Sequence, residues 1–212
     1  MIVTPPFFLR WMLPEAVHWN VPTHEKKIFL TFDDGPTTDI TYEILSILKN
    51  YNARATFFCV GENIIKHPKV FQAILAQGHN VGNHTHNHPD GLKNSIDFYY
   101  DNIEKCQKLH PFQLFRPPYG HISPLQVKYL SKQYSIILWS VLSYDFRPEI
   151  SPRKCLKNVL EYSGQGSIVV FHDLSKAYSN MIFALPRFIE HFLLKGYAFE
   201  AIYPETSASK VG

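Results

Sequence analysis

The sequence predicts an α/β fold whose mostly parallel sheet is either open or closed into a barrel. Seven segments of strand-like composition alternate with six segments of helical periodicity, which is the order typical of parallel sheets. Polar residues suited to chemistry follow the ends of five of these strands, and the carboxyl edge of such a sheet is where active sites form. The 212 residues, 45% hydrophobic and 18% charged, suit one ordered domain with a sizeable core.

The expected strands are rich in β-branched and aromatic residues, and the turn Gly164-Gln165-Gly166 precedes the sixth of them. The seven strands are Ile28–Phe32, Ala55–Val60, His79–Gly82, Gln113–Phe115, Ser135–Val141, Ser167–Phe171 and Ala198–Ile202.

The expected helices carry apolar residues at helical spacing, with Pro68, Pro124 and Pro152 near three of the starts and Gly78 after one end. The first is capped by Thr38 or Asp39. Pro186 should bend or restart the last one. The six helices run from Thr38 or Asp39 to Tyr51, from Pro68 to Gly78, from Ile96 to Leu109, from Pro124 past Leu130, from Pro152 to Tyr162 and from Asn180 to Lys195.

The chain is expected to hold one domain with short extensions. Residues 1–26 contain several prolines and are interpreted as an extended arm that packs on the domain through Trp11 and Trp19. Residues 27–205 form the domain, and residues 206–212 form a polar tail.

The composition excludes some partners. The formal net charge is +3 and the basic residues are scattered, so neither a nucleic-acid face nor a membrane face is expected. No apolar run approaches the roughly 18 residues of a transmembrane segment, and Phe7–Leu9 is too short for a signal peptide. The three cysteines are widely spaced, with Cys59 expected in the core. We therefore expect a cytoplasmic protein, whose oligomeric state the sequence leaves open.

The stretch from Thr31 to Pro36 places two adjacent carboxylates, Asp33 and Asp34, where the first strand runs into a turn. Adjacent residues of a strand point to opposite sides, so one carboxylate can face a metal while the other faces something else. Like charges this close need a cation or a hydrogen-bond donor beside them. The residues alone do not decide which carboxylate takes which role.

His84 and His88 are four residues apart, so one helical turn would place both imidazoles on one face. His86 would then point elsewhere. Two histidines and one carboxylate leave coordination positions open, which suits a catalytic Zn²⁺ and also a non-haem Fe(II). The second carboxylate could then accept a proton from water.

Three further segments supply polar groups at strand ends. Arg116 can pair with a carboxylate and keep it ionised. The two prolines after Arg116 fix the backbone and leave the amide of Tyr119 to donate to an oxyanion. His172 ends an apolar strand and is a candidate general acid, with Asp145 as the residue that orients it.

These segments, in this order, resemble the polysaccharide deacetylases of carbohydrate esterase family 4, the NodB homology domain. The likeness spans about residues 27–202. It is carried by Thr31-Phe32-Asp33-Asp34-Gly35-Pro36, by His84-Thr85-His86-Asn87-His88, by Arg116-Pro117-Pro118-Tyr119-Gly120, more weakly by Ser143-Tyr144-Asp145-Phe146, and by Val170-Phe171-His172.

The resemblance implies a distorted, incomplete (β/α) barrel with about seven parallel strands and metal-dependent removal of N-acetyl groups from sugars. It also implies the site roles. Asp33 would be the general base held by Arg116, and His172 would be the general acid tuned by Asp145. Tyr119 would give the oxyanion N–H. The metal ligands would be Asp34, His84 and His88.

Two positions depart from the family pattern. Leu142 stands where many members carry an aspartate, and Phe146 stands where a tryptophan is usual. Both changes leave the expected chemistry in place and alter the wall of the groove.

The expected function is thus a metal-dependent hydrolase, with one divalent ion, most simply Zn²⁺, acting on an acetylated amino sugar of the peptidoglycan or chitin type. Three alternatives remain from the sequence: hydrolysis of a non-sugar linear or cyclic amide, a carbohydrate-binding module without turnover, and an Fe(II) oxygenase. The last lacks the strand pattern of a double-stranded β-helix.

Overall fold

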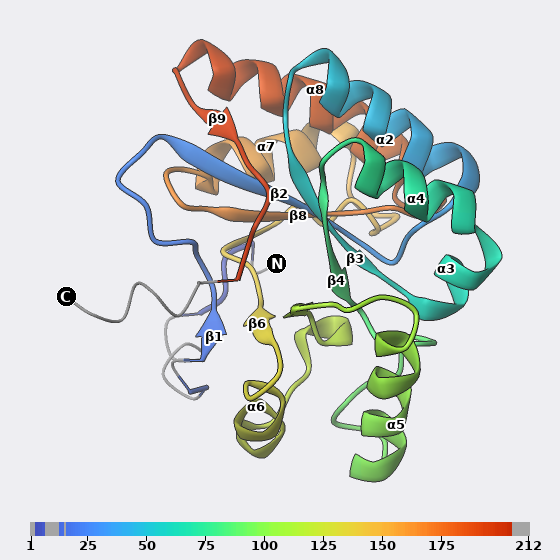
Figure 1. Ribbon diagram of the computed structural model, residues 1–212. Coiled ribbons are helices and arrows are strands. Elements are labelled where there is room, and N and C mark those ends of the chain that lie inside the picture. The colour runs from blue at the N-terminus through green and yellow to red at the C-terminus, as the bar shows by residue number, and fades with distance from the viewer. Residues whose placement is uncertain (1–2, 7–12, 15, 205–212) are drawn as a thin grey trace.

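The computed structural model of the protein describes residues 3–6, 13–14 and 16–204, and these form a curled parallel sheet with helices outside it (Figure 1). The strands of these residues are β1 (Val17–His18), β2 (Lys27–Asp33), β3 (Ala55–Cys59), β4 (Asn80–Asn83), β5 (Leu114–Phe115), β6 (Ser135–Ile137), β7 (Val141–Leu142), β8 (Ile168–His172) and β9 (Ala198–Phe199). The helices are α2 (Thr38–Asn50), α3 (Gly61–Lys66), α4 (Pro68–Ala76), α5 (Ile96–Gln107), α6 (Pro124–Leu130), α7 (Pro152–Tyr162) and α8 (Tyr178–Leu194), with a 3₁₀ turn at Pro118–Gly120.

The strand order shows why the sheet curls. Its neighbours run β1-β6-β5-β4-β3-β2-β8-β7, with β9 paired to β2, and every paired strand is parallel to its neighbour. β6 and β7 lie toward opposite ends of this order, yet only residues 138–140 join them. Three residues span roughly 10 Å when fully extended, so the two ends must approach each other. The predicted α/β class and incomplete barrel are confirmed.

The prediction of one strand at Ser135–Val141 was wrong, because the chain changes partners within it. Ser135–Ile137 pairs with β5 and β1, whereas Val141–Leu142 pairs with β8. Between them, the amide of Leu138 donates to the carbonyl of His18, and Ser140 bonds the backbone of Ile168. Strand-like composition continues through the break, so composition alone could not locate it.

Three helical predictions need correction. α3 was missed, since its six residues carry too short a pattern to stand out. α8 starts at Tyr178 and runs through Pro186 without restarting. The N-cap of α2 is Thr37, not Thr38 or Asp39, and its hydroxyl donates to Asp173 instead of capping the helix.

The core lies between the sheet and the helices that follow its outer face. α4, α2 and α8 lie side by side over the middle strands, and α7 packs against α8 (Figure 1). Stacked rings of Phe32 and Phe57, with centroids 5.0 Å apart, join β2 to β3 inside this layer. The three cysteines are buried and free, and Cys59 fills the core as expected.

In the N-terminal stretch, Val17–His18 adds a strand beside β6 and Trp19 packs against the core. Trp11 and the predicted tail 206–212 lie outside the described residues. Among the residues that the structure describes, no helix combines the length and the apolar composition needed to span a bilayer.

Candidate active site

Two predicted catalytic residues end adjacent central strands. Asp33 closes β2 and His172 closes β8, and the two are direct register partners in the parallel ladder. Register partners on neighbouring strands project from the same face of a sheet. The strand ends therefore place a carboxylate and an imidazole side by side at the carboxyl edge.

Arg116 lies beneath Asp33 and is completely buried. Its Nη1 donates to Asp33 Oδ1 at 2.7 Å and to the hydroxyl of Thr31 at 2.8 Å. Nε and Nη2 donate to the carbonyls of Ile137 and Leu138, the point at which the chain passes from β6 towards β7. Burial acts to lower the pKa of Arg116, and the Asp33 carboxylate opposes this. Through these hydrogen bonds, the guanidinium holds the Asp33 carboxylate in a fixed position relative to the sheet.

Three ligand-type side chains converge beside this pair. Asp34, His84 and His88 each offer one atom, and these atoms lie within 4.8 Å of one another. Asp34 Oδ1 is 3.5 Å from Nε2 of His84 and 3.1 Å from Nε2 of His88. Burial acts to raise the pKa of Asp34, but the two imidazoles hold it well below its usual range.

The donor set fits a divalent cation. Asp34 Oδ1 is buried and has no hydrogen-bond partner among the described residues. Nδ1 of His84 lies 2.8 Å from the carbonyl oxygen of Arg116, which can only accept, so Nδ1 carries the proton and Nε2 presents its lone pair. A carboxylate oxygen that faces two imidazole nitrogens is a ligand set that suits a divalent cation.

The histidine segment is a loop, so the predicted helical turn was wrong. Thr85 and His88 have positive φ angles of 67° and 61°, which a helix does not contain. Side-chain amides hold this conformation: Asn83 accepts from the amide of Thr85, and Asn102 accepts from those of His86 and Asn87. No local pattern marks this role of Asn83 and Asn102, because an asparagine in a loop or helix is common.

His172, which is partly exposed, pairs with the fully buried Asp145. Nδ1 of His172 lies 2.7 Å from Oδ1 of Asp145, and the amide of His172 donates to Oδ2 at 2.8 Å. Burial would lower the pKa of His172, but the Asp145 carboxylate, with Asp34 and Asp33 farther off, raises it to about 9. The imidazole is therefore protonated at neutral pH, with Nε2 as its remaining donor.

These groups share a pocket of about 400 Å³. Tyr119 is 60% exposed and has a backbone φ of 61°. The centroid of its ring lies 4.7 Å from that of His88. Of the eight predicted site residues, Arg116 and Asp145 lie behind the pocket and the other six line it. Leu142 and Phe146, which the sequence placed in the wall of the groove, line it as well. The sequence prediction missed the remaining lining, which is Pro117, His121, Trp139, Tyr144, Arg147, Val170 and Lys176. Aromatic residues near strand ends are the signal that could have located part of it.

Asp173 supports the two-aspartate turn from behind. Its carboxylate accepts from the hydroxyls of Thr37 and Thr41, and its amide donates to the carbonyl of Asp33. A Cβ at Gly35 would collide with this carboxylate. Glycine at position 35 is therefore required by close approach, since any side chain would displace Asp173 or the turn.

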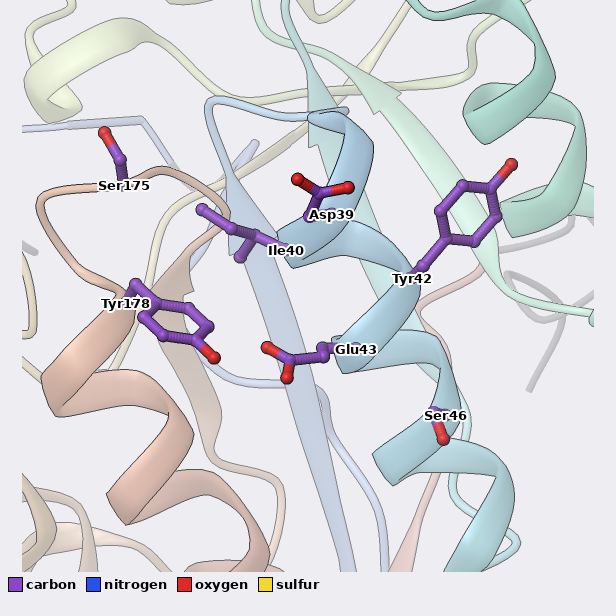
Figure 2. A pocket seen from close by; sticks show the side chains of 7 residues that line it. All are labelled: Asp39, Ile40, Tyr42, Glu43, Ser46, Ser175 and Tyr178. Atoms are coloured by element: carbon purple, nitrogen blue, oxygen red, sulfur yellow. The ribbon is translucent and has the colours of Figure 1, made fainter.

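A larger hollow, about 600 Å³, lies between the starts of α2 and α8. Figure 2 shows Glu43 of α2 pointing toward Tyr178 of α8, while Tyr42 projects from the other side of α2. None of its described lining residues belongs to the ligand cluster or to the His172–Asp145 pair. The predicted site residues therefore gather at the smaller pocket, not at this hollow.

A parallel α/β sheet with a carboxylate–histidine ligand cluster, a held carboxylate and a protonated imidazole at one edge defines a hydrolase-type site. The family model for polysaccharide deacetylase matches residues 20–134. The chain belongs to this family, as its sequence motifs predicted, and it is a hydrolase of carbon–nitrogen bonds other than peptide bonds.

Individual relatives extend the comparison. The chain is 33% identical over 208 residues to a peptidoglycan-N-acetylglucosamine deacetylase of Bacillus cereus, covering 94% of this chain and 75% of the relative. It is 34% identical over 163 residues to the peptidoglycan-N-acetylmuramic acid deacetylase PdaC of Bacillus subtilis, covering 73% of this chain and 34% of the relative. The crystal structure of the Bc1960 peptidoglycan N-acetylglucosamine deacetylase superposes with a TM-score of 0.84 at 33% identity, covering 93% of this chain and 94% of that one.

Proposed function

We propose that this protein removes acetyl groups from N-acetylated amino sugars of the peptidoglycan type and that it depends on one divalent metal ion. The observation that carries the proposal is the joint placement of the Asp34–His84–His88 cluster, the Arg116-held Asp33 and the His172–Asp145 pair around one pocket. The similarity to peptidoglycan-N-acetylglucosamine and peptidoglycan-N-acetylmuramic acid deacetylases supports a peptidoglycan-type sugar as the substrate.

In this proposal Asp33 is the general base. The guanidinium of Arg116 holds the Asp33 carboxylate in place through a charged hydrogen bond, with the carboxylate positioned to accept a proton from the attacking water. The amide of Tyr119 is the candidate donor to the oxyanion that forms on the acetyl carbonyl. Protonated His172 gives a proton to the nitrogen as the carbon–nitrogen bond breaks, which releases the free amine and acetic acid, and the acid then ionises to acetate. Asp33 loses the proton it took from water and His172 regains one through solvent, so both return to their starting states.

Asp34, His84 and His88 would hold the metal. When bound, a divalent ion supplies Lewis-acid chemistry that polarises the acetamide carbonyl and makes water a stronger nucleophile. Two imidazoles and one carboxylate are a ligand set typical of catalytic zinc, and we propose Zn²⁺ as the ion. The same set suits Fe(II), and metal analysis after expression in defined medium would decide between them.

The alternative functions make different predictions in one assay. Acetate release is measured from a peptidoglycan-derived oligomer, from a chitin oligomer and from a non-sugar N-acetyl amide. The proposal expects release from the sugars, and release from the non-sugar amide alone would support the alternative hydrolase. Binding of the oligomers without any acetate release would support the binding module.

Asp33→Asn sharpens this assay, because it removes the base and keeps the shape of the side chain. We expect the rate to fall about 10²- to 10⁴-fold, with metal content unchanged. Asp39→Asn is the matched control, because Asp39 lies at the start of α2 and lines the other hollow. If Asp33→Asn lost its metal while Asp34→Asn kept it, the two aspartates would have the opposite roles.

We also propose that the protein is cytoplasmic. The support is the set of three buried, free thiols, which fits a reducing compartment. In that compartment the enzyme would meet soluble sugar fragments in place of the assembled wall. Cell fractionation with detection of the native protein tests the location, and recovery in the medium or wall fraction would contradict it.

A further inference from the structure

The basic side chains around the site pocket differ in how they are paired. His121 faces Asp90, with Nδ1 2.9 Å from Oδ2, and Arg147 donates to Glu149 at 3.1 Å. Lys176 lines the same pocket, and no ion pair joins it to any residue that the structure describes. The ammonium group of Lys176 can therefore pair with an anionic group of a bound ligand.

The position of Lys176 is set by an aromatic ring. Its Nζ lies 5.6 Å from the centroid of the Phe146 ring, and the His172 ring lies 4.6 Å from the same centroid. Arg147 also approaches this ring, with its guanidinium carbon 6.0 Å from the centroid. Phe146 thus carries two cations beside the imidazole that is the proposed acid.

The backbone around Lys176 fixes the side to which it points. Ser175 and Tyr178 line the hollow shown in Figure 2, whereas Lys176 lines the site pocket. Ala177 between them is buried. The segment therefore separates the two hollows and presents its ammonium group to the one where the chemistry occurs.

The carboxylates of this pocket cannot neutralise Lys176. Asp33 is held by Arg116, and Asp34 faces two imidazoles where a cation belongs. A neutral chitin-type sugar would leave the ammonium group without a partner. A carboxylate on the substrate could accept a charged hydrogen bond from Lys176, which is separated from His172 by the Phe146 ring.

We propose that Lys176 makes this enzyme selective for N-acetyl sugars that carry a carboxylate close to the acetamido group. This rests on the proposed deacetylase function and names its substrate class. The carboxylate can be the lactyl ether of a muramic-type sugar or part of a peptide attached to it, and both present the same group to Lys176.

The test compares a neutral N-acetylglucosamine oligomer with peptide-free and peptide-bearing peptidoglycan fragments. The kcat/KM ratio of anionic to neutral substrate is measured for wild type, Lys176→Gln and Lys176→Arg. We expect the glutamine variant to lower this ratio about 3- to 30-fold, as for loss of one charged hydrogen bond, mainly through KM. Arginine should restore most of the ratio, and added salt should weaken it in the wild type.

Lys132→Gln is the matched control, because Lys132 also lies over a tyrosine ring, at Tyr129, but outside the site pocket. A ratio changed equally by both glutamine variants, or by neither, would overturn the proposal. A preference for the peptide-free fragment would assign the lactyl carboxylate, and a preference that needs the peptide would assign the peptide carboxylate.

Direct binding separates this proposal from the proposed function. Dissociation constants of the same fragments are measured by calorimetry, without turnover. Tighter binding of anionic fragments that is lost in Lys176→Gln would uphold the carboxylate site even if no acetate were released. Acetate release with equal binding and equal rates for neutral and anionic sugars would overturn the carboxylate site and leave the deacetylase function standing.

Discussion

The Nη1 atom of Arg116 donates to Oδ1 of Asp33 across 2.7 Å, and both side chains are buried. The pair therefore forms where water cannot compensate for a missing partner. The other donors of Arg116 bond three more oxygens, and its guanidinium carbon lies 4.0 Å from the centroid of the Phe58 ring. This one residue links the proposed base to β2, to β3 and to the chain between β6 and β7.

Replacing Arg116 by methionine should destabilise the fold as well as stop catalysis. Asp33 would keep a buried charge without its partner, and the free energy of unfolding should fall by about 3–5 kcal/mol. Lysine should recover only part of this, since it lacks the planar fork. Urea denaturation measures the change, and Arg153→Met, at an exposed position of α7, is the control. A stability equal to that of wild type would contradict the linking role.

Removing one imidazole should remove the metal. We expect His84→Ala to lose the bound ion, because two remaining ligands do not make a catalytic site. The readout is metal content by elemental analysis after exhaustive dialysis against a trace of Zn²⁺. His86→Ala is the control, because His86 lies in the same loop but packs against Gly61 outside the cluster. One equivalent of metal retained by His84→Ala would exclude His84 from the site.

The His172–Asp145 pair should make stability depend on pH. The pKa of His172 is about 9 in the fold against an ordinary 6.5, so the folded state favours its charged form. This contribution is complete below about pH 6.5 and is lost as the pH rises through about 9. In metal-free protein, Asp145→Asn should therefore cost most at low pH in this window and least above it. Denaturation across that range measures the difference, and a cost independent of pH would contradict the pairing.

The acyl part of the pocket should be narrow. Leu142 and Val170, neighbours in the β7–β8 ladder, give it an apolar wall that suits one methyl group, worth about 1 kcal/mol or slightly less when buried. Longer acyl chains should overpack it at about 1–3 kcal/mol. The measurement is kcat/KM for N-acetyl, N-propionyl and N-butyryl glucosamine oligomers with wild type and Leu142→Asp. Equal rates for the three acyl groups would refute a narrow wall, and a large gain in the aspartate variant would show that the missing carboxylate limits the wild type.

The site could be anticipated because parallel strands all end at one edge. Asp33 and His172 are the last residues of their strands, and His84 and Arg116 directly follow theirs. Topology alone brings such positions together. The fold class followed from the same alternation of strands and helices. The motifs then named a family that the comparison confirmed, while the individual roles of these residues remain predictions.

What the sequence could not supply were features that depend on contacts between distant segments. The strand is interrupted at residues 138–140, where Arg116 and β8 form hydrogen bonds with this segment. No local sequence pattern marks this interruption. The histidine loop is shaped by Asn102, which stands on a helix 16 residues from His86. Lys176 looks like any surface lysine until the pocket and the Phe146 ring are placed beside it.

Residues 138–140, which connect β6 to β7, also limit the width of the groove. They form the short connection between the two ends of the curled sheet, and the carbonyl of Leu138 accepts a hydrogen bond from Arg116. Because Arg116 bonds both this connection and Asp33, a change in the width of the groove would also change the orientation of the Asp33 carboxylate. Lengthening this connection by a single residue should therefore widen the pocket and displace Asp33 together.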